Sequence, residues 1–364
     1  MRASSITVCE PNFPESSDRL ARTRTVKKRL ALIGAAVAVP LTSAIAGPMS
    51  VLRSAGEKAD AVLPLSWGLL AICVIVIAVI GILLALALAR QPRSSSTFES
   101  PAPLPVSRPP GGITWIYIGI ALTAFTLLGS LVWSMVVLAH VAAPPGKVGL
   151  ELEVTGHQWW WQVDYIGDPV SRRFTTANEI HIPVGVPVRI ALKSVDVIHS
   201  FWVPALSGKT DLIPGQINTT WLEAREPGTY RGQCAEYCGV QHAHMAFSVV
   251  ADLQSTFAAW WQAQLAPPPP PIEPQAKAGQ IAFLRRCGSC HTVRGTDAGG
   301  ITGPDLSHLA QRATIAAGTL PNTSGHRGAW IADPQGIKPG NQMPVLGLTG
   351  PEIAAVQAYL GTLK

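Results

Sequence analysis

The sequence predicts a multi-domain membrane protein: a transmembrane α-hairpin comes first, then a Greek-key β-barrel, and last a small all-α domain. Three observations predict this order: two long apolar runs, a middle region of short β-rich runs divided by Gly and Pro, and a C-terminal region with helical patterns. The 364 residues are 48% hydrophobic and only 14% charged, which is typical of a chain that lies partly in a membrane.

Residues 1–46 form a leader that is typical of an export signal. They carry seven Lys/Arg and three Asp/Glu, and the apolar run Leu30–Ala46 ends in the small residues Ala44-Ile45-Ala46, which offer a cleavage site. The alternative is a retained helix, which Pro40 and the short apolar length disfavour.

The apolar runs Val62–Ala89 and Ile113–Val141 predict a transmembrane hairpin over residues 62–141, because each exceeds the roughly 20 residues that cross a hydrocarbon core. The loop between them, Arg90–Gly112, carries three arginines and one glutamate. The positive-inside rule therefore places this loop in the cytoplasm. We expect everything after residue 141 on the periplasmic side of a bacterial inner membrane.

Residues 147–265 read as a β-sandwich or barrel that is closed by a short amphipathic helix at Leu253–Gln264. The short β-rich runs in this region include Leu150–Thr155, Val186–Leu192, Thr219–Glu223 and Phe247–Ala251.

A proline-rich linker, residues 266–274, separates this domain from residues 275–364. Its run Pro267–Pro271 favours an extended, stiff spacer. The last region is expected to contain helices at Ala276–Arg286 and Gly350–Leu360, joined by long loops.

The charges argue against nucleic acid as a partner. The formal net charge is +6, but residues 1–46 supply +4 of it, and no basic stripe interleaved with aromatic residues occurs elsewhere. Residues 147–265 hold eight basic and eleven acidic side chains, whereas residues 275–364 hold eight basic and four acidic ones. These opposite signs favour docking of the two domains on each other.

The loop from Cys234 to Met245 packs two thiols, two imidazoles and a thioether into twelve residues. Thiolate and thioether are soft ligands and imidazole is a borderline one, so the set favours copper over magnesium or calcium. A strained disulfide or a zinc site are the alternatives. The remaining cysteines, Cys9 and Cys73, do not indicate a disulfide framework.

A second motif, Cys287-Gly288-Ser289-Cys290-His291, predicts covalent attachment of a c-type haem, with His291 as an axial ligand of the iron. The same spacing also occurs in zinc sites and by chance. Met343 is the only methionine after the linker, and a thioether ligand suits electron transfer because it raises the potential. His308 and His326, both expected to be exposed, are the alternatives for the sixth ligand.

The copper loop, Cys-x-Glu-x-Cys-Gly-x-x-His-x-x-Met, resembles the dinuclear copper (CuA) site of cytochrome c oxidase subunit II. The resemblance continues outside the loop and is closest to forms with a fused C-terminal cytochrome c. The further matching stretches are Gly156–Trp161, Asp196–Pro204 and Lys209–Gly215, and Gly303–Leu306 resembles a cytochrome c loop that packs near the proximal ligand.

The resemblance implies a cupredoxin-like β-barrel, an all-α c-type cytochrome domain and a set of copper ligands. Cys234 and Cys238 would bridge two coppers, and His199 and His242 would each bind one. Met245 and the backbone carbonyl of Glu236 would complete the set. The Glu236 side chain would hold a magnesium at the contact with subunit I.

Trp159 is a tentative point of electron uptake, also by resemblance, although interface packing explains a tryptophan run equally well. His244 is expected to be a loop residue and His157 a structural one.

The function implied is that of the subunit that feeds electrons into a haem-copper terminal oxidase. Electrons would pass from a soluble or membrane cytochrome c, through haem c and CuA, to subunit I, where oxygen is reduced to water and protons are pumped. Subunit III and membrane lipid are further expected partners, and no catalytic residue for oxygen is assigned to this chain. A CuA subunit of a nitric oxide reductase and a membrane-tethered copper carrier are the alternatives.

Overall fold

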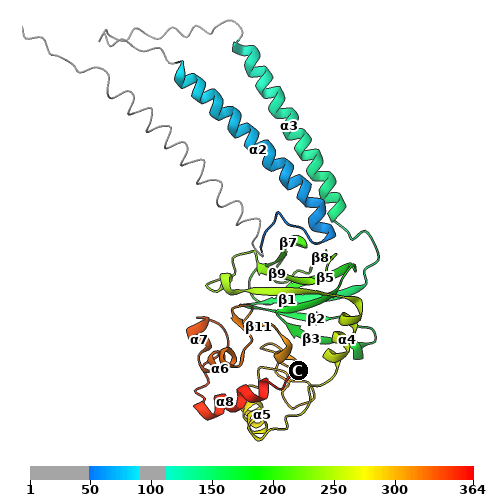
Figure 1. Ribbon diagram of the computed structural model, residues 1–364, viewed down its shortest axis with the longest axis vertical. Helices are drawn as coiled ribbons and strands as arrows, with labels where there is room; N and C mark the ends of the chain where they lie inside the picture. The colour runs from blue at the N-terminus through cyan, green and yellow to red at the C-terminus, as the bar shows by residue number, and fades with distance from the viewer. Residues whose placement is uncertain (1–48, 91–111) are drawn as a thin grey trace, which may run out of the picture. The chain divides into compact units, whose positions relative to one another are not determined.

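The computed structural model describes residues 49–90 and 112–364. The expected leader, residues 1–46, and most of the expected cytoplasmic loop lie outside the described residues. The described part contains an apolar helix pair, a β-domain and a helical C-terminal domain, as the sequence predicts (Figure 1).

The helix pair consists of α2 (Glu57–Ala89) and α3 (Gly112–Val141), of 33 and 30 residues. At about 1.5 Å per residue each helix is longer than the roughly 30 Å of a hydrocarbon core. Their large apolar side chains are mostly exposed, which suits lipid as their surroundings. The helices approach closely at Gly68, where a Cβ atom would lie 2.5 Å from the Trp133 ring. Both predicted spans are therefore helices, and α2 begins five residues before the predicted start at Val62.

The β-domain has two five-stranded sheets, with strand orders β3-β2-β1-β5-β8 and β4-β10-β9-β6-β7. Each sheet is mixed: β1 and β5 are parallel, as are β4 and β10, and the other pairs are antiparallel. The strands are β1 (Leu150–His157), β2 (Trp160–Tyr165), β3 (Phe174–Ala177), β4 (Glu179–Pro183), β5 (Val188–Ser194), β6 (His199–Val203), β7 (Ser207–Leu212), β8 (Asn218–Leu222), β9 (Gly228–Cys234) and β10 (Ala246–Asp252).

The two sheets enclose one apolar core, because alternate side chains along each strand point inward. On β2 the buried residues are Trp161, Val163 and Tyr165. The Trp161 ring lies 5.1 Å from that of Phe247 on β10, which ties the first sheet to the second. Helix α4 (Gln254–Leu265) follows β10 and packs Trp261 against Tyr165, with ring centroids 5.4 Å apart. This arrangement is the predicted cupredoxin-like fold.

The C-terminal domain is helical, and its core forms between helices α5 and α8. A Cβ at Gly279 of α5 would lie 1.9 Å from the carbonyl oxygen of Ala355 on α8, so only glycine allows this approach. Phe283 and Tyr359 fill the contact, with ring centroids 5.4 Å apart. The elements are α5 (Pro274–Arg286), β11 (Thr314–Ile315), β12 (Leu320–Pro321), α6 (Ser324–Ala332), α7 (Pro334–Ile337) and α8 (Gly350–Leu360).

Residues 266–273 join α4 to α5 without a regular element. Ala266 has φ −78° and ψ 147°, which is the polyproline II conformation expected before a proline run. The segment also lies against the C-terminal domain, because His308 Nε2 bonds the carbonyl of Ala266 at 3.1 Å and a Cβ at Gly295 would lie 2.7 Å from Pro267 Cβ.

Candidate metal centre and haem site

The copper loop, Cys234–Met245, connects two adjacent antiparallel strands of the second sheet. Cys234 ends β9, Met245 immediately precedes β10, and Cys238 and His242 lie between them. His199 comes from elsewhere in the chain, as the first residue of β6, which pairs with β9. The β-sheet register therefore brings a residue 35 positions away to the loop.

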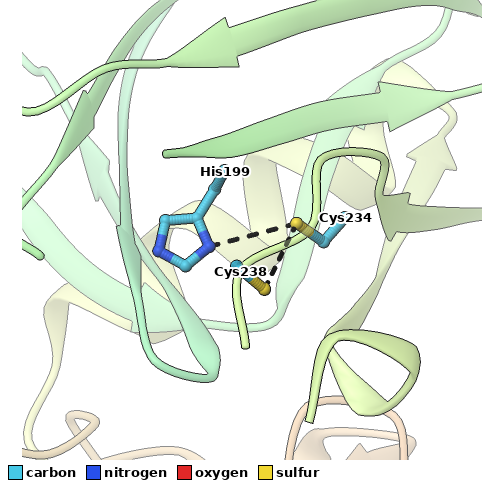
Figure 2. Close-up of side chains that lie close together, drawn as sticks. All are labelled: His199, Cys234 and Cys238. Atoms are coloured by element: carbon cyan, nitrogen blue, oxygen red, sulfur yellow. Dashed lines mark hydrogen bonds between the residues drawn. The ribbon is translucent and has the colours of Figure 1, made fainter. Parts of the chain in front are cut away.

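The side chains converge at one buried point, shown in part in Figure 2. The Sγ atoms of Cys234 and Cys238 lie 3.8 Å apart, and His199 Nδ1 lies 3.9 Å from Cys234 Sγ. On the other side of the pair, Cys238 Sγ lies 3.6 Å from His242 Nδ1 and 3.8 Å from Met245 Sδ. Sequence reasoning selected all of these residues, and the structure brings them together.

The backbone carbonyl of Glu236 lies at the sulfur pair, whereas its side chain lies in a separate ion pair. Its carbonyl oxygen lies 3.2 Å from Cys234 Sγ, beside the sulfur pair. Its carboxylate points elsewhere and lies 3.4 Å from the Lys209 ammonium in a surface ion pair. The backbone position fits the expected carbonyl ligand, while the expected magnesium would have to compete with Lys209.

The surroundings of the two thiols shift their pKa values in opposite directions. The hydrogen bond between the two thiols lowers the pKa of Cys234 to about 4 and raises that of Cys238. Burial would lower the pKa of His199, but its hydrogen bonds to Asp196 and Cys234 outweigh burial and raise it. A thiolate is the form of cysteine that binds metal, so this pocket stabilises the binding form of Cys234.

The haem motif follows α5 as a tight turn, in which the N–H groups of Cys290 and His291 both donate to the carbonyl of Cys287 at 3.0 Å. His291 Nδ1 donates to the carbonyl of Pro304 at 2.8 Å, which leaves Nε2 for a metal. A Cβ at Gly303 would lie 2.6 Å from the His291 ring, so the glycine makes room for the imidazole. Burial lowers the pKa of His291, which favours the neutral, ligating form.

The Met343 segment is held by its backbone. Its N–H donates to Asn341 Oδ1 and its carbonyl accepts from Gln335 Nε2, both at 2.8 Å. The sequence predicts that the alternative ligand His308 is exposed, and this prediction is wrong. The side chain is only 5% exposed, and its Nε2 bonds the carbonyl of Ala266. It is buried because the linker folds over it. His326, half-buried, bonds Thr323 at the start of α6.

Trp159 lies against the copper loop and is only 8% exposed. Its indole Nε1 donates to the carbonyl of Cys238 at 2.9 Å, so the aromatic segment contacts a thiol-bearing residue directly. His244 Nδ1 bonds Gln241 within the loop, and His157 stacks on Trp160 at 4.2 Å, consistent with the roles expected of both histidines.

Two polar residues near the site were missed by sequence reasoning. Asp196 bonds His199, and its position three residues before that histidine was the available signal. Lys338 donates to the carbonyls of Trp159 and His244, and no local pattern marks it as buried.

The fold and the site define a class of membrane-anchored proteins that join a cupredoxin-like metal domain to a cytochrome c domain. Residues 167–252 match the family "Cytochrome C oxidase subunit II, periplasmic domain", and residues 276–364 match the family "Cytochrome c". The chain belongs to the cytochrome c oxidase subunit 2 family. These matches imply copper and haem as cofactors.

Relatives of the same family are similar over most of the chain. Cytochrome c oxidase subunit 2 of Alkalihalophilus pseudofirmus (strain OF4) is 39% identical over 255 residues, 69% of this chain and 72% of that protein. The protein of that name from Bacillus subtilis (strain 168) is 30% identical over 270 residues, 69% and 74% of the two chains. The crystal structure of the periplasmic domain of subunit II of cytochrome oxidase of Bradyrhizobium japonicum is 33% identical, covers 33% of this chain and 95% of that one, and has a TM-score of 0.31.

Proposed function

We propose that this chain accepts electrons from a cytochrome c and delivers them, by way of haem c and a dinuclear copper centre, to subunit I of a haem-copper oxidase. Its membership of the subunit 2 family and its cytochrome c domain support an oxidase role of this general kind. Subunit I would reduce oxygen to water and couple this to proton pumping.

The observation that carries the proposal is the convergence of soft donors around the sulfur pair. Metal–thiolate bonds are about 2.3 Å long for zinc, so sulfurs that share a metal lie at most about 4.6 Å apart. The 3.8 Å between Cys234 Sγ and Cys238 Sγ satisfies this limit. Two thiolates, two imidazoles, a thioether and a carbonyl supply donors to both sides of the pair. Thiolate and imidazole suit both copper and zinc, but such sites generally bind copper more tightly than zinc, so the set favours copper.

When bound, copper and haem would supply the one-electron redox chemistry. The protein's part is to hold the ligands still: β6, β9 and β10 fix His199, Cys234 and Met245 in a buried scaffold. In the C-terminal domain Cys287 and Cys290 would hold the haem through thioether links, and His291 and Met343 would bind its iron. Pro304 orients His291 through its carbonyl.

The partners and location follow from the same proposal. Helices α2 and α3 would anchor the chain in the bacterial inner membrane, where subunits I and III and lipid would surround them. Both metal-binding domains would face the periplasm. Trp159 would take part in electron uptake by the copper centre, because its indole contacts the Cys238 carbonyl.

The test uses the purified oxidase complex that contains the full chain. The wild type should hold two coppers and one covalent haem per chain and oxidise cytochrome c with oxygen. Cys234→Ser should lose the dinuclear centre, its near-infrared band and turnover, while the haem remains attached and reducible. The matched variant Cys73→Ser, in α2, should keep all of these. A Cys234→Ser complex with two coppers and an unchanged band would contradict the copper assignment.

A further inference from the structure

The β-domain and the haem domain meet along a polar contact that we call the interdomain seam. Its two sides lie within the single compact unit Val51–Lys364. The β-domain side consists of Trp159, Gln241, His244 and Ala246, and the other side consists of residues 316–318 and 338–340. Gln241 Nε2 donates to the carbonyl of Pro339 at 2.8 Å, and the Ala246 N–H donates to the carbonyl of Ala317 at 3.0 Å.

At the centre of the seam lies Lys338, which is only 2% exposed. Its Nζ donates to the carbonyls of Trp159 at 2.8 Å, His244 at 2.7 Å and Ala316 at 3.1 Å. An ammonium has three N–H donors, and each here has an acceptor. Two of the acceptors belong to the β-domain and one to the haem domain, so the side chain bridges the two.

A buried charge is retained only where its surroundings satisfy it. Burial lowers the pKa of Lys338 to about 7, which reflects the cost of removing the ammonium from water. Removing the side chain would take this donor away from all three carbonyls; Ala316 would keep the Thr319 hydroxyl, whereas the bonds that link the two domains, to Trp159 and His244, would be lost. Lys338 therefore contributes hydrogen bonds to both sides of the interdomain seam.

The haem-domain side of the seam adopts an unusual backbone. Ala316 and Ala317 have φ 53° and 57°, a left-handed conformation that is unfavourable for a residue with a Cβ. The carbonyl of Ala317 accepts a hydrogen bond from the Ala246 N–H across the seam, and that of Ala316 accepts one from Lys338 on the same side. Gly318 completes the turn with φ 75°, and a Cβ there would lie 2.9 Å from Ala246 Cβ. Such a turn persists where the contacts around it fix it.

The seam also joins the two candidate redox sites. His244 stands between the proposed copper ligands His242 and Met245, and Trp159 contacts Cys238. Lys338 opens the segment that leads to Met343. The residue that begins the segment carrying the proposed iron ligand therefore bonds the copper loop through its side chain, at the carbonyl of His244.

We propose that Lys338 is a positioning residue, which fixes the haem domain on the copper loop and so sets the rate of electron transfer between the two centres. This inference rests on the proposed function. The opposite charge balance of the two domains favours the same docked arrangement.

The first test measures docking in the intact wild-type protein, without any substitution. A water-soluble amine-acylating reagent is applied briefly, and each lysine is quantified by mass spectrometry. Lys338 should react at least about tenfold more slowly than Lys277, an exposed lysine on α5 of the same domain, because acylation requires local opening. Equal labelling of the two lysines would overturn the inference.

The second test compares Lys338→Met with the control Lys277→Met in the full complex. The haem spectrum, the copper near-infrared band and both midpoint potentials should be unchanged in both variants. Electron transfer from haem to copper, followed after rapid photoreduction of the haem, should slow by about tenfold or more in Lys338→Met only, since small misplacements of reacting groups are costly.

The outcomes separate the two hypotheses. A wild type with both centres present but no electron transfer between them would refute the proposed function. A Lys338→Met protein that transfers electrons at the wild-type rate would refute the positioning role alone. If Lys338→Met fails to accumulate, the acylation measurement on the wild type still decides whether Lys338 is buried in the seam.

Discussion

Asp196 binds the imidazole of His199, which follows it by three residues, on the ring nitrogen that faces away from the sulfur pair. Its Oδ1 lies 2.8 Å from His199 Nε2. A neutral imidazole carries one N–H, and donation of Nε2–H to the carboxylate leaves the Nδ1 lone pair available. That Nδ1 is the atom 3.9 Å from Cys234 Sγ. The carboxylate thus selects the tautomer and orientation that a metal at the sulfur pair requires.

We expect Asp196→Asn to weaken copper binding by about 10- to 100-fold, the usual effect of losing such a carboxylate behind a ligating histidine. The neutral amide keeps an oxygen acceptor but lacks the negative charge that makes His199 a stronger donor. The measurement is the rate at which a chelator removes copper, followed by the near-infrared band. The matched control is Asp168→Asn, an exposed aspartate of the same domain. Equal rates of copper loss in the two variants would contradict the role given to Asp196.

The fold was largely predictable because its signals are periodic and local. The helices at Ala276–Arg286 and Gly350–Leu360 were placed within two residues, since proline and a Thr349–Glu352 capping box mark their starts. The predicted strand Val186–Leu192 begins two residues early, because a turn lies at Val184 and Gly185 and pairing with β1 starts only at Val188. Strand pairing across the sheets could not be read from local pattern.

The sequence suggests the candidate ligand residues because their types and spacing carry chemistry, and a family resemblance adds the distant His199. The residues at the contact between the two domains could not be predicted from the sequence. Lys338 reads as a surface lysine beside proline and glycine, and its burial depends on Trp159, 179 residues away in sequence. His308 was misread as exposed for the same reason: its cover is Ala266, 42 residues earlier.

For the proposed axial ligand we expect Met343→Leu to lower the haem midpoint potential, because a thioether favours reduced iron. The weak red-end absorption of Met-ligated ferric haem should disappear, while the haem stays attached through Cys287 and Cys290. Leucine conserves the side-chain volume, so folding should be little affected. Redox titration and optical spectra measure the change, with Met135→Leu on α3 as the control. An unchanged potential and spectrum in Met343→Leu would return His326 or His308 to consideration.

Membrane orientation is testable by labelling from one side. A cysteine replacing Ser95, in the expected cytoplasmic loop, should react with a membrane-impermeant thiol reagent only when the cytoplasmic face is open. A cysteine replacing the exposed Lys277 should react from the periplasmic face. Intact spheroplasts and inverted vesicles supply the two conditions. Reversal of this pattern would mean that the arginine-bearing loop does not face the cytoplasm.

The interdomain contact also contains an acid-sensitive group, Glu179 on β4. Its Oε2 accepts a hydrogen bond from the backbone N–H of Ala313 in the haem domain at 2.9 Å, and its Oε1 lies 3.4 Å from His181 Nε2. Burial would raise the pKa of Glu179, but the hydrogen bonds from His181 and Ala313, with the charge of Arg312 nearby, outweigh burial and lower it. The ionised form is therefore favoured in the folded protein over the unfolded one.

A carboxyl group with a lowered pKa in the folded state adds stability above its unfolded pKa of about 4.5, and this stability is lost as the pH falls through the lower folded value. Glu179→Gln keeps an acceptor for Ala313 but no charge, so at pH 7 it should cost up to about 1.5–3 kcal/mol, the range for hydrogen bonds to charged groups. The difference in thermal unfolding midpoint between wild type and Glu179→Gln should thus shrink towards zero below the folded pKa. Glu226→Gln, at an exposed glutamate of the same domain, should show a much smaller effect at pH 7. If the destabilisation by Glu179→Gln were the same at pH 7 and in acid, the ionised carboxylate would not be the stabilising form.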